Sequence, residues 1–422
     1  MPSTVYREIN RCRVCGNPHL EEVLTLGPQA LTGVFPRSPE ERVTTGPLTL
    51  VKCSERDPGA SCGLLQLHQS YNPDEMYRGS YGYRSGLNPS MVRHLQHIVD
   101  KIIELVPLQP GDVVLDIGSN DASLLKSYPN PRLTRIGIDP SAANFRQYYP
   151  DDVTLVTDYF SATAFRSAMG RRKAKAITSI AMFYDLESPQ SFVEDIHSVL
   201  ADDGVWVFEQ SYMPTMLQKT AYDTVCHEHL EYYGLRQITW LLDHAGFTIL
   251  DVELNDINGG SFRVTASPQR SPLRPRSNTW ETLLRGEETA GLHTLKPYLA
   301  FKDSVFRHRD ELTRAVHEIH QRGKTILGYG ASTKGNVVLQ FCGFTPREIP
   351  AIAERNTEKY GRFTPGTLIP MISEQEARDR HPDYFLALPW HFREDFLKRE
   401  RAFLDGGGRF LFPLPTVDVV GA

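Results

Sequence analysis

One stretch of the sequence decides the fold: Val114-Leu115-Asp116-Ile117-Gly118-Ser119-Asn120-Asp121-Ala122. Its apolar residues predict a buried strand, and Gly118 predicts a tight turn directly after that strand. Around this stretch, residues 111–266 alternate strand and helix, which is typical of a doubly wound α/β domain. The predicted strands of this domain are Val113–Ile117, Thr134–Ile138, Val153–Val156, Ala176–Ile180, Val205–Phe208, Thr248–Leu254 and Phe262–Ala266.

Polar side chains follow the first three predicted strands at their carboxyl ends, where ligands bind in folds of this kind. A carboxylate after the second strand can accept both ribose hydroxyls, and a carboxylate with an aromatic ring after the third can address an adenine. The turn has one glycine instead of the three of the dinucleotide signature, which favours S-adenosylmethionine over NAD or FAD. Strand-end capping is the alternative role. The expected cofactor site consists of Asp116, Gly118, Asn120, Asp121, Asp139, Asp158 and Tyr159.

A second string further along the chain groups side chains that transfer protons: Tyr222-Asp223-Thr224-Val225-Cys226-His227-Glu228-His229. It places two imidazoles, a carboxylate and a phenol in one short segment. A neutral imidazole suits proton abstraction near pH 7. A cofactor turn followed by such a segment predicts an enzyme, although the same residues could simply pack a loop.

Four of the six cysteines lie near the N-terminus: Cys12, Cys15, Cys53 and Cys62. In a reducing compartment, clustered cysteines are more often metal ligands than disulfides. Cys12 and Cys15 have the spacing of a zinc knuckle, and four protein ligands would leave no open position, so the zinc would be structural. A region this small needs such support for its core. Four buried thiols without a ligand are the alternative.

The rest of the chain predicts a second, smaller α/β domain. Residues 267–290 predict a polar linker, and a long helical segment follows to about Arg322. Gly328-Tyr329-Gly330-Ala331-Ser332-Thr333-Lys334-Gly335-Asn336 then repeats the pattern of strand, glycine turn and helix. Backbone N–H groups at such a turn bind anions and Lys334 adds charge, which predicts a site for a nucleotide diphosphate, with a plain turn as the alternative. The predicted strands here are Thr325–Tyr329, Ala351–Ala353, Tyr384–Ala387 and Phe410–Phe412.

Composition narrows the possible partners. The net charge of −5 and the absence of a basic run argue against nucleic acid. No stretch of 18 or more apolar residues and no apolar signal core are present, so we expect a cytosolic protein that does not enter a membrane. The expected organisation is a zinc-binding module over residues 1–70, a cofactor-binding domain over 71–268, and a linker helix with the second α/β domain over 269–422. A monomer is expected.

Together these motifs resemble those of the S-adenosylmethionine-dependent C-methyltransferases that act on nucleotide-linked 4-keto deoxysugars. The resemblance covers nearly the whole chain and implies a Rossmann-like methyltransferase domain between the zinc module and a smaller Rossmann-like domain. The matching segments beyond those already quoted are Tyr81-Gly82-Tyr83-Arg84-Ser85-Gly86, Gly259-Gly260-Ser261 and Pro365-Gly366-Thr367-Leu368-Ile369-Pro370.

The resemblance implies a mechanism. A base removes the hydrogen at carbon 3, which the 4-keto group acidifies, and the resulting enolate attacks the cofactor methyl. The implied base is His229, and the implied helpers are Glu228, Tyr222, Tyr77 and Tyr81. The implied substrate-binding residues are Tyr83, Arg84, His227, Asn258, Tyr329, Lys334 and Asn336. An epimerase or isomerase that reprotonates the same enolate on its other face is the alternative.

Two positions depart from the usual pattern of these enzymes. Cys226 stands where a tyrosine usually precedes His-Glu-His, and Asn258 stands where a histidine usually precedes the Gly-Gly-Ser hairpin. Both lie near the sugar site that the resemblance implies. The sequence therefore leaves the identity of the sugar and of the methylated carbon open.

Overall fold

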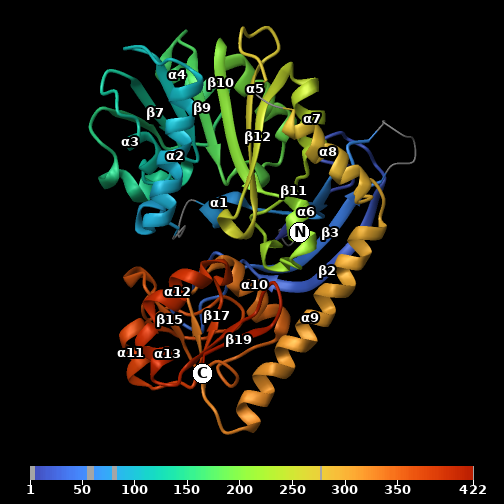
Figure 1. Ribbon diagram of the computed structural model, residues 1–422, viewed down its shortest axis with the longest axis vertical. Coiled ribbons are helices and arrows are strands. Elements are labelled where there is room, and N and C mark those ends of the chain that lie inside the picture. Colours follow the sequence, from blue (N-terminus) through green and yellow to red (C-terminus); the bar gives the residue numbers. More distant parts are fainter. Residues whose placement is uncertain (1–4, 55–60, 78–82, 276–277, 422) are drawn as a thin grey trace.

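The computed structural model describes residues 5–54, 61–77, 83–275 and 278–421, which form two α/β domains joined by an N-terminal β-module (Figure 1). The predicted mixed α/β architecture is confirmed. In Figure 1 the cofactor-type domain lies above, the C-terminal domain below, and the blue N-terminal strands run between them.

The upper domain is built on a seven-stranded sheet with the order β12-β13-β10-β9-β6-β7-β8. Strands β6 to β10 are parallel, and β13 is antiparallel to both of its neighbours. The strands are β6 Val113–Ile117, β7 Thr134–Ile138, β8 Val153–Val156, β9 Ala174–Ile180, β10 Leu200–Ser211, β12 Phe247–Asn255 and β13 Ser261–Pro268. All seven predicted strands are present. The order reverses between β6 and β9, and ligands bind at the carboxyl ends of strands at such a point.

Helices cover both faces of this sheet, because its strands are apolar on both sides. Helix α2 spans Pro89–Leu105, and the side chain of Asn88 caps its N-terminus. The other helices of the domain are α3 Ser123–Lys126, α4 Ala162–Met169, α5 Pro189–Val199, α6 Met213–Gln218 and α7 Leu235–His244.

The N-terminal module contains a four-stranded sheet with the order β11-β4-β3-β2. One of its two edge strands, β11 Glu231–Tyr232, lies far along the chain from the other three and follows His229 almost directly. The other strands of the module are β1 Tyr6–Glu8, β2 Leu20–Ala30, β3 Thr45–Cys53, β4 Leu65–Leu67 and β5 Gln69–Tyr71, and the short helix α1 spans Pro73–Tyr77. The sheet thus holds a strand that the local sequence does not reveal.

The C-terminal domain has a six-stranded sheet with the order β16-β15-β14-β17-β18-β19, parallel except for β19. All four strands predicted here are present. The strands are β14 Ile326–Tyr329, β15 Ile352–Glu354, β16 Met371–Ser373, β17 Tyr384–Ala387, β18 Arg409–Phe412 and β19 Asp418–Val420. The helices are α10 Thr333–Cys342, α11 Glu374–Asp379, α12 Arg393–Arg399 and α13 Arg401–Asp405. Its strand order reverses between β14 and β17.

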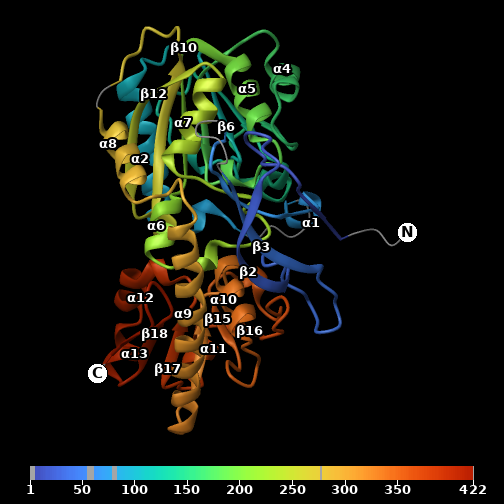
Figure 2. The same cartoon turned by 90° about the vertical axis from the view of Figure 1, so that its right-hand side faces the viewer.

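The segment between the two domains is more helical than predicted. Residues 279–289 form α8, so the prediction of a polar linker over 267–290 is wrong in its second half. The physical reason is that Trp280, Leu283 and Leu284 pack on the core of the upper domain. Helix α9, Lys296–Gln321, then runs along the C-terminal domain (Figure 2). None of the helices in the described ranges combines the length and the apolar content that crossing a bilayer requires.

Candidate active site

The glycine turn after β6 has the geometry that the sequence predicts. Gly118 has a φ of +71°, and a Cβ at this position would lie 3.1 Å from Cγ of Met182, so a side chain here would be strained. Below the turn, the carboxylate of Asp116 accepts a hydrogen bond of 2.6 Å from Oγ1 of Thr178. Burial raises the pKa of Asp116 to about 7, against the lowering effect of this hydrogen bond.

Asp139 shapes the same turn from the end of β7. Its Oδ2 accepts a hydrogen bond of 2.7 Å from the backbone N–H of Asn120, and its Oδ1 accepts bonds of 2.7 Å from the N–H and the hydroxyl of Ser141. Through these hydrogen bonds the carboxylate of Asp139 caps the backbone after β7, which is the alternative role that the sequence analysis gives for it. They also place Asp139 at the carboxyl end of β7, beside the glycine turn.

Two residues predicted to bind substrate, Tyr83 and Arg84, lie instead over the glycine turn. Asn120 donates from Nδ2 to the carbonyl of Tyr83 at 3.0 Å and accepts at Oδ1 from the N–H of Ser85 at 3.0 Å. Nε of Arg84 lies 3.8 Å from Oδ2 of Asp121. Residues 83–86 therefore form a cover on the turn, which no periodicity in the sequence indicates.

The predicted adenine-side residues lie at the outer edge of the sheet. Asp158 and Tyr159 follow β8, and both are exposed. The hydroxyl of Tyr159 donates to Oδ1 of Asp74 in α1 at 3.2 Å. The hydroxyl of Tyr159 thus joins the β8 end of the sheet to α1.

The loop after β9 connects the glycine turn to the histidine segment, and the sequence analysis missed it. Met182 contacts Gly118, as described above. The ring of Tyr184 lies against the ring of His229 with 4.4 Å between their centroids, and its carbonyl accepts from the N–H of Leu230 at 2.8 Å. Ligands bind at the carboxyl ends of parallel strands, and the sequence analysis used this rule for the first three strands only. Applied to β9 as well, the rule would have identified the loop.

His229 has the hydrogen bonding that a base requires. Its Nδ1 lies 2.8 Å from the carbonyl of Thr224. Because a carbonyl oxygen only accepts, Nδ1 carries the ring hydrogen and Nε2 keeps a lone pair. No hydrogen bond to Nε2 comes from any residue in the described ranges. Burial, and secondarily the charge of Lys334, lower the pKa of His229 to about 3, so the ring is neutral at pH 7.

Glu228 points to the N-terminal module. It is only 8 % exposed, and its Oε2 accepts from the hydroxyl of Thr32 at 3.2 Å. A side chain at Gly33 would collide with Oε1 of Glu228, so the backbone of the module lies directly on the carboxylate. Burial raises the pKa of Glu228. The hydroxyl of Tyr77 lies 3.5 Å from the carbonyl of Glu228, whereas Tyr81 falls outside the described residues.

Tyr222 and His227, although near His229 in sequence, have their side chains in the core. The hydroxyl of Tyr222 lies 3.9 Å from Sγ of Cys342, among side chains of the C-terminal domain. His227 is fully buried, with Nε2 3.2 Å from the carbonyl of Gln29, and burial lowers its pKa to about 4. Both side chains pack between modules, Tyr222 against the C-terminal domain and His227 against the N-terminal module.

Tyr329 and Asn336 are also core residues in this structure. Tyr329 is 1 % exposed, and its hydroxyl donates to Glu400 at 2.6 Å, so its ring is not free to stack on a base. Asn336 is fully buried and donates from Nδ2 to the carbonyl of Thr32 at 2.7 Å. Both fasten parts of the fold together, and a strand or helix pattern cannot distinguish that role from ligand binding.

The C-terminal domain contributes Lys334 to the region around His229. Nζ of Lys334 donates to the carbonyl of Asn258 at 3.0 Å, so two of the predicted substrate-binding residues are brought together. The sequence analysis missed Trp390 and His391, which follow β17. Nε1 of Trp390 donates to Oδ2 of Asp223 at 2.8 Å and ties the histidine segment to the C-terminal domain.

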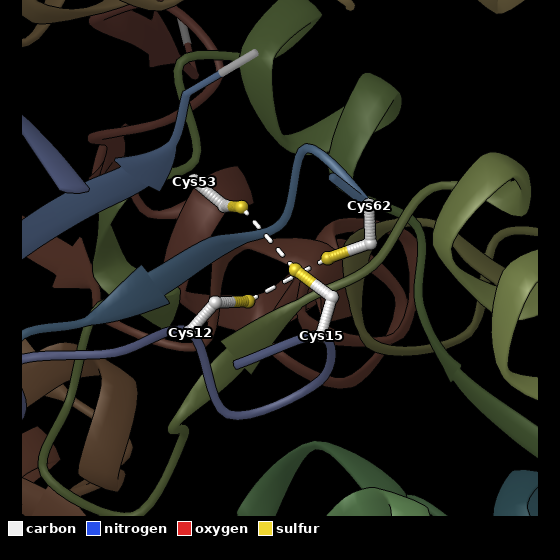
Figure 3. Close-up of side chains that lie close together, drawn as sticks. All are labelled: Cys12, Cys15, Cys53 and Cys62. Carbon is white, nitrogen blue, oxygen red and sulfur yellow. Dashed lines mark hydrogen bonds between the residues drawn. The ribbon is translucent and has the colours of Figure 1, made fainter. Parts of the chain in front are cut away.

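The four N-terminal cysteines form a cluster that fits a zinc ion (Figure 3). Their sulfur atoms all lie within 4.8 Å of one another. The Sγ atoms of Cys12 and Cys62 are 3.5 Å apart, and those of Cys15 and Cys53 are 3.6 Å apart. A tetrahedral zinc with bonds of about 2.3 Å to sulfur needs separations of roughly 3.8 Å. The donor set is therefore that of a closed, structural zinc site.

Comparisons with known proteins agree with this arrangement of modules. Three family models match in order along the chain: a zinc binding domain over residues 12–77, a methyltransferase domain over 91–252, and a C-methyltransferase C-terminal domain over 256–415. The chain is 30 % identical to the C-methyltransferase NovU of Streptomyces niveus, over 99 % of this chain and 98 % of that protein.

Solved structures with some likeness to this chain include two methyltransferases. The plantazolicin methyltransferase BpumL has a TM-score of 0.34 at 12 % identity, over 41 % of this chain and 82 % of that chain. The magnesium protoporphyrin IX methyltransferase of Synechocystis PCC 6803 has a TM-score of 0.31 at 16 % identity, over 42 % and 78 %.

Proposed function

We propose that this chain, which belongs to the S-adenosylmethionine-dependent C-methyltransferases, methylates carbon 3 of a nucleotide-linked 4-keto sugar. The observation that carries the proposal is the state of His229. Its Nδ1 hydrogen is committed to the carbonyl of Thr224, so the neutral ring presents a lone pair on Nε2. A hydrogen beside a ketone is the kind of proton that such a base removes, and the enolate that results is a carbon nucleophile.

Lys334 supports a nucleotide diphosphate as part of the acceptor. It lies at the N-terminus of α10, whose cap Ser332 accepts from the N–H of Gly335 at 3.0 Å, and helix N-termini bind phosphate groups. Burial is the main cause of the lowered pKa of His229, and the charge of Lys334 lowers that pKa further. A diphosphate paired with Lys334 would offset that charge and make His229 a stronger base. Binding of the acceptor would therefore itself prepare the base.

The chain's own residues for the cofactor are those around Gly118. S-adenosylmethionine, when bound, supplies a methyl group on a positively charged sulfur. In the proposal, Asp139 accepts hydrogen bonds from the ribose, while Asp158 and Tyr159 lie on the adenine side. Met182 and Tyr184 line the path from the turn to His229, as their contacts with Gly118 and the histidine ring indicate.

Replacing Asp139 by Ala should weaken binding of S-adenosylmethionine by about 10- to 100-fold, because charged hydrogen bonds to the ribose are lost and the turn at Asn120 is released. Isothermal titration calorimetry measures this effect. Asp151→Ala, which removes an exposed carboxylate on the loop before β8, is the matched control and should keep the affinity of the parent protein. Equal affinities in the two variants would contradict the assignment of Asp139.

The acceptor is tested by incubating the protein with S-adenosylmethionine and a panel of nucleotide-linked 4-keto hexoses in deuterated water, followed by mass spectrometry. We expect one acceptor to gain the mass of a methylene unit, with the label of a methyl-labelled cofactor in the product. Deuterium uptake beside the ketone without methyl gain would establish the epimerase alternative. Methyl gain on a different class of acceptor would refute the proposal that the acceptor is a nucleotide-linked sugar.

A further inference from the structure

Arg84 lies in the cover over the glycine turn, and two neighbouring side chains hold its guanidinium group. The guanidinium carbon lies 4.2 Å from the centre of the Tyr148 ring, so the planar group lies over the aromatic face. Nε lies 3.8 Å from Oδ2 of Asp121, which is too far for a hydrogen bond, and this nitrogen is buried without a hydrogen-bond partner among the described residues. Stacking and charge thus hold an arginine whose hydrogen-bond donors are not used.

Backbone groups, and not the Arg84 side chain, fasten the cover to the turn. The N–H of Ser85 donates to Oδ1 of Asn120 at 3.0 Å, and the N–H of Gly86 donates to Oδ2 of Asp121 at 3.0 Å. A Cβ at Gly86 would lie 2.5 Å from Oδ2 of Asp121, so a side chain there would collide with the carboxylate. The Arg84 side chain is therefore available to a ligand: it is 22 % exposed, and its Nη1 and Nη2 donate to no residue in the described ranges.

The charges around the turn fit a ligand that has one acidic group and positive groups elsewhere. S-adenosylmethionine has this distribution, with a positive sulfur, an ammonium group and a single carboxylate, and the aspartates of the turn suit its positive groups. Two basic side chains in the described ranges contact Asp121. Nζ of Lys126 already donates to the carbonyl oxygens of Asp121 at 2.9 Å and of Tyr148 at 3.4 Å. Arg84 is therefore the one of the two that has donors left for a carboxylate.

We infer that Arg84 binds the carboxylate of the cofactor's methionine moiety, and is a cofactor-binding residue instead of the substrate-binding residue that the sequence motif implies. A guanidinium group binds a carboxylate through two parallel N–H···O hydrogen bonds, a geometry that a lysine ammonium group does not provide. The inference rests on the proposed cofactor site at Gly118, and it does not depend on which acceptor is methylated.

The test compares S-adenosylmethionine with decarboxylated S-adenosylmethionine, which keeps the amino group and the positive sulfur but lacks the carboxylate. Isothermal titration calorimetry of the full chain, without an acceptor, measures both affinities. The parent protein should bind the decarboxylated compound about 10- to 100-fold more weakly, because a charge-assisted pair is lost. In Arg84→Met the affinity for S-adenosylmethionine should fall by a similar factor, while the affinity for the decarboxylated compound should stay near the parent value. The difference between the two ligands should therefore disappear.

Two further variants separate the charge of Arg84 from its geometry and from the general effect of losing an arginine. Arg84→Lys keeps the charge without the paired donors, so it should restore only part of the affinity for S-adenosylmethionine. Arg93→Met is the matched control, because Arg93 is an exposed arginine on α2, the helix that follows the cover. This variant should bind both ligands as the parent protein does.

Equal affinities of the parent protein for the two ligands would overturn the inference. Equal losses for both ligands in Arg84→Met would also overturn it, and would give the arginine a role only in the structure of the cover. An unchanged cofactor affinity in Arg84→Met together with a raised KM for the acceptor would return Arg84 to the substrate site. Absence of binding of either ligand would refute the proposed cofactor site and the inference with it. If the parent protein distinguishes the two ligands but methylates no sugar, the inference stands and only the proposed acceptor fails.

Discussion

His229→Ala is expected to abolish methyl transfer, with kcat reduced by about 10²- to 10⁴-fold and the fold retained. The base would be gone, while the only side-chain hydrogen bonds lost among the described residues are those of Nδ1 to Thr224. Binding of S-adenosylmethionine should not change, because the glycine turn and Asp139 lie on the other side of the loop after β9. Single-turnover assays with a labelled cofactor methyl group measure the chemical step, and calorimetry measures cofactor affinity.

His97→Ala is the matched control, because His97 is an exposed histidine on α2. It should keep both activity and affinity. A His229→Ala enzyme with full kcat would exclude His229 as the base. Loss of activity together with loss of thermal stability would indicate that the imidazole is needed for packing against Tyr184 instead.

Removal of the zinc is the second large effect that we expect. Cys53→Ser should lose the metal and lower the melting temperature by several degrees, because metal binding at a closed cysteine site contributes directly to folding free energy. Cys53 also ends β3, which pairs with β4, and β4 in turn pairs with β11. The loss should therefore reach the segment of His229 and reduce activity as well as stability.

Metal content by plasma mass spectrometry and melting by calorimetry test this expectation, with a chelator titration of the parent protein beside them. Cys342→Ser is the control, because Cys342 is a partly exposed cysteine of α10 outside the cluster, and it should retain one zinc per chain. A Cys53→Ser protein that is free of zinc, folded and as stable as the parent would refute a structural role for the metal.

The α/β strands were predictable because most of them contain a short apolar run close to a glycine, proline or aspartate. β6, β7 and β8 coincide with their predicted ranges for this reason. The zinc ligands were equally predictable from the sequence, because the spacing of cysteines is a local property. β11 was not, because Glu231–Tyr232 is too short to show a period and becomes a strand only through its pairing with β4.

The roles of individual side chains near the site were harder to predict than the site itself. Tyr329 and Lys334 lie in one glycine-rich string, yet Tyr329 is in the core while Lys334 reaches the neighbourhood of His229. Tyr184 and Trp390 have no motif around them, and only the meeting of distant segments brings Tyr184 to the ring of His229 and Trp390 to Asp223. Sequence patterns locate turns and strands, but packing decides which side chains face the space between domains.

The short segment from Asp223 to β11 limits how this enzyme can be recombined. Asp223 is bonded to Trp390 of the C-terminal domain, and Glu231–Tyr232 pairs with β4 of the zinc module, so His229 is anchored on both sides by other parts of the chain. A chimera that takes only the central domain from a relative would contain the residues that make these two contacts without the zinc module and C-terminal domain that they evolved to contact. Acceptor specificity should therefore be exchanged between relatives by grafting all three modules together, and the three are expected to have been inherited as one unit.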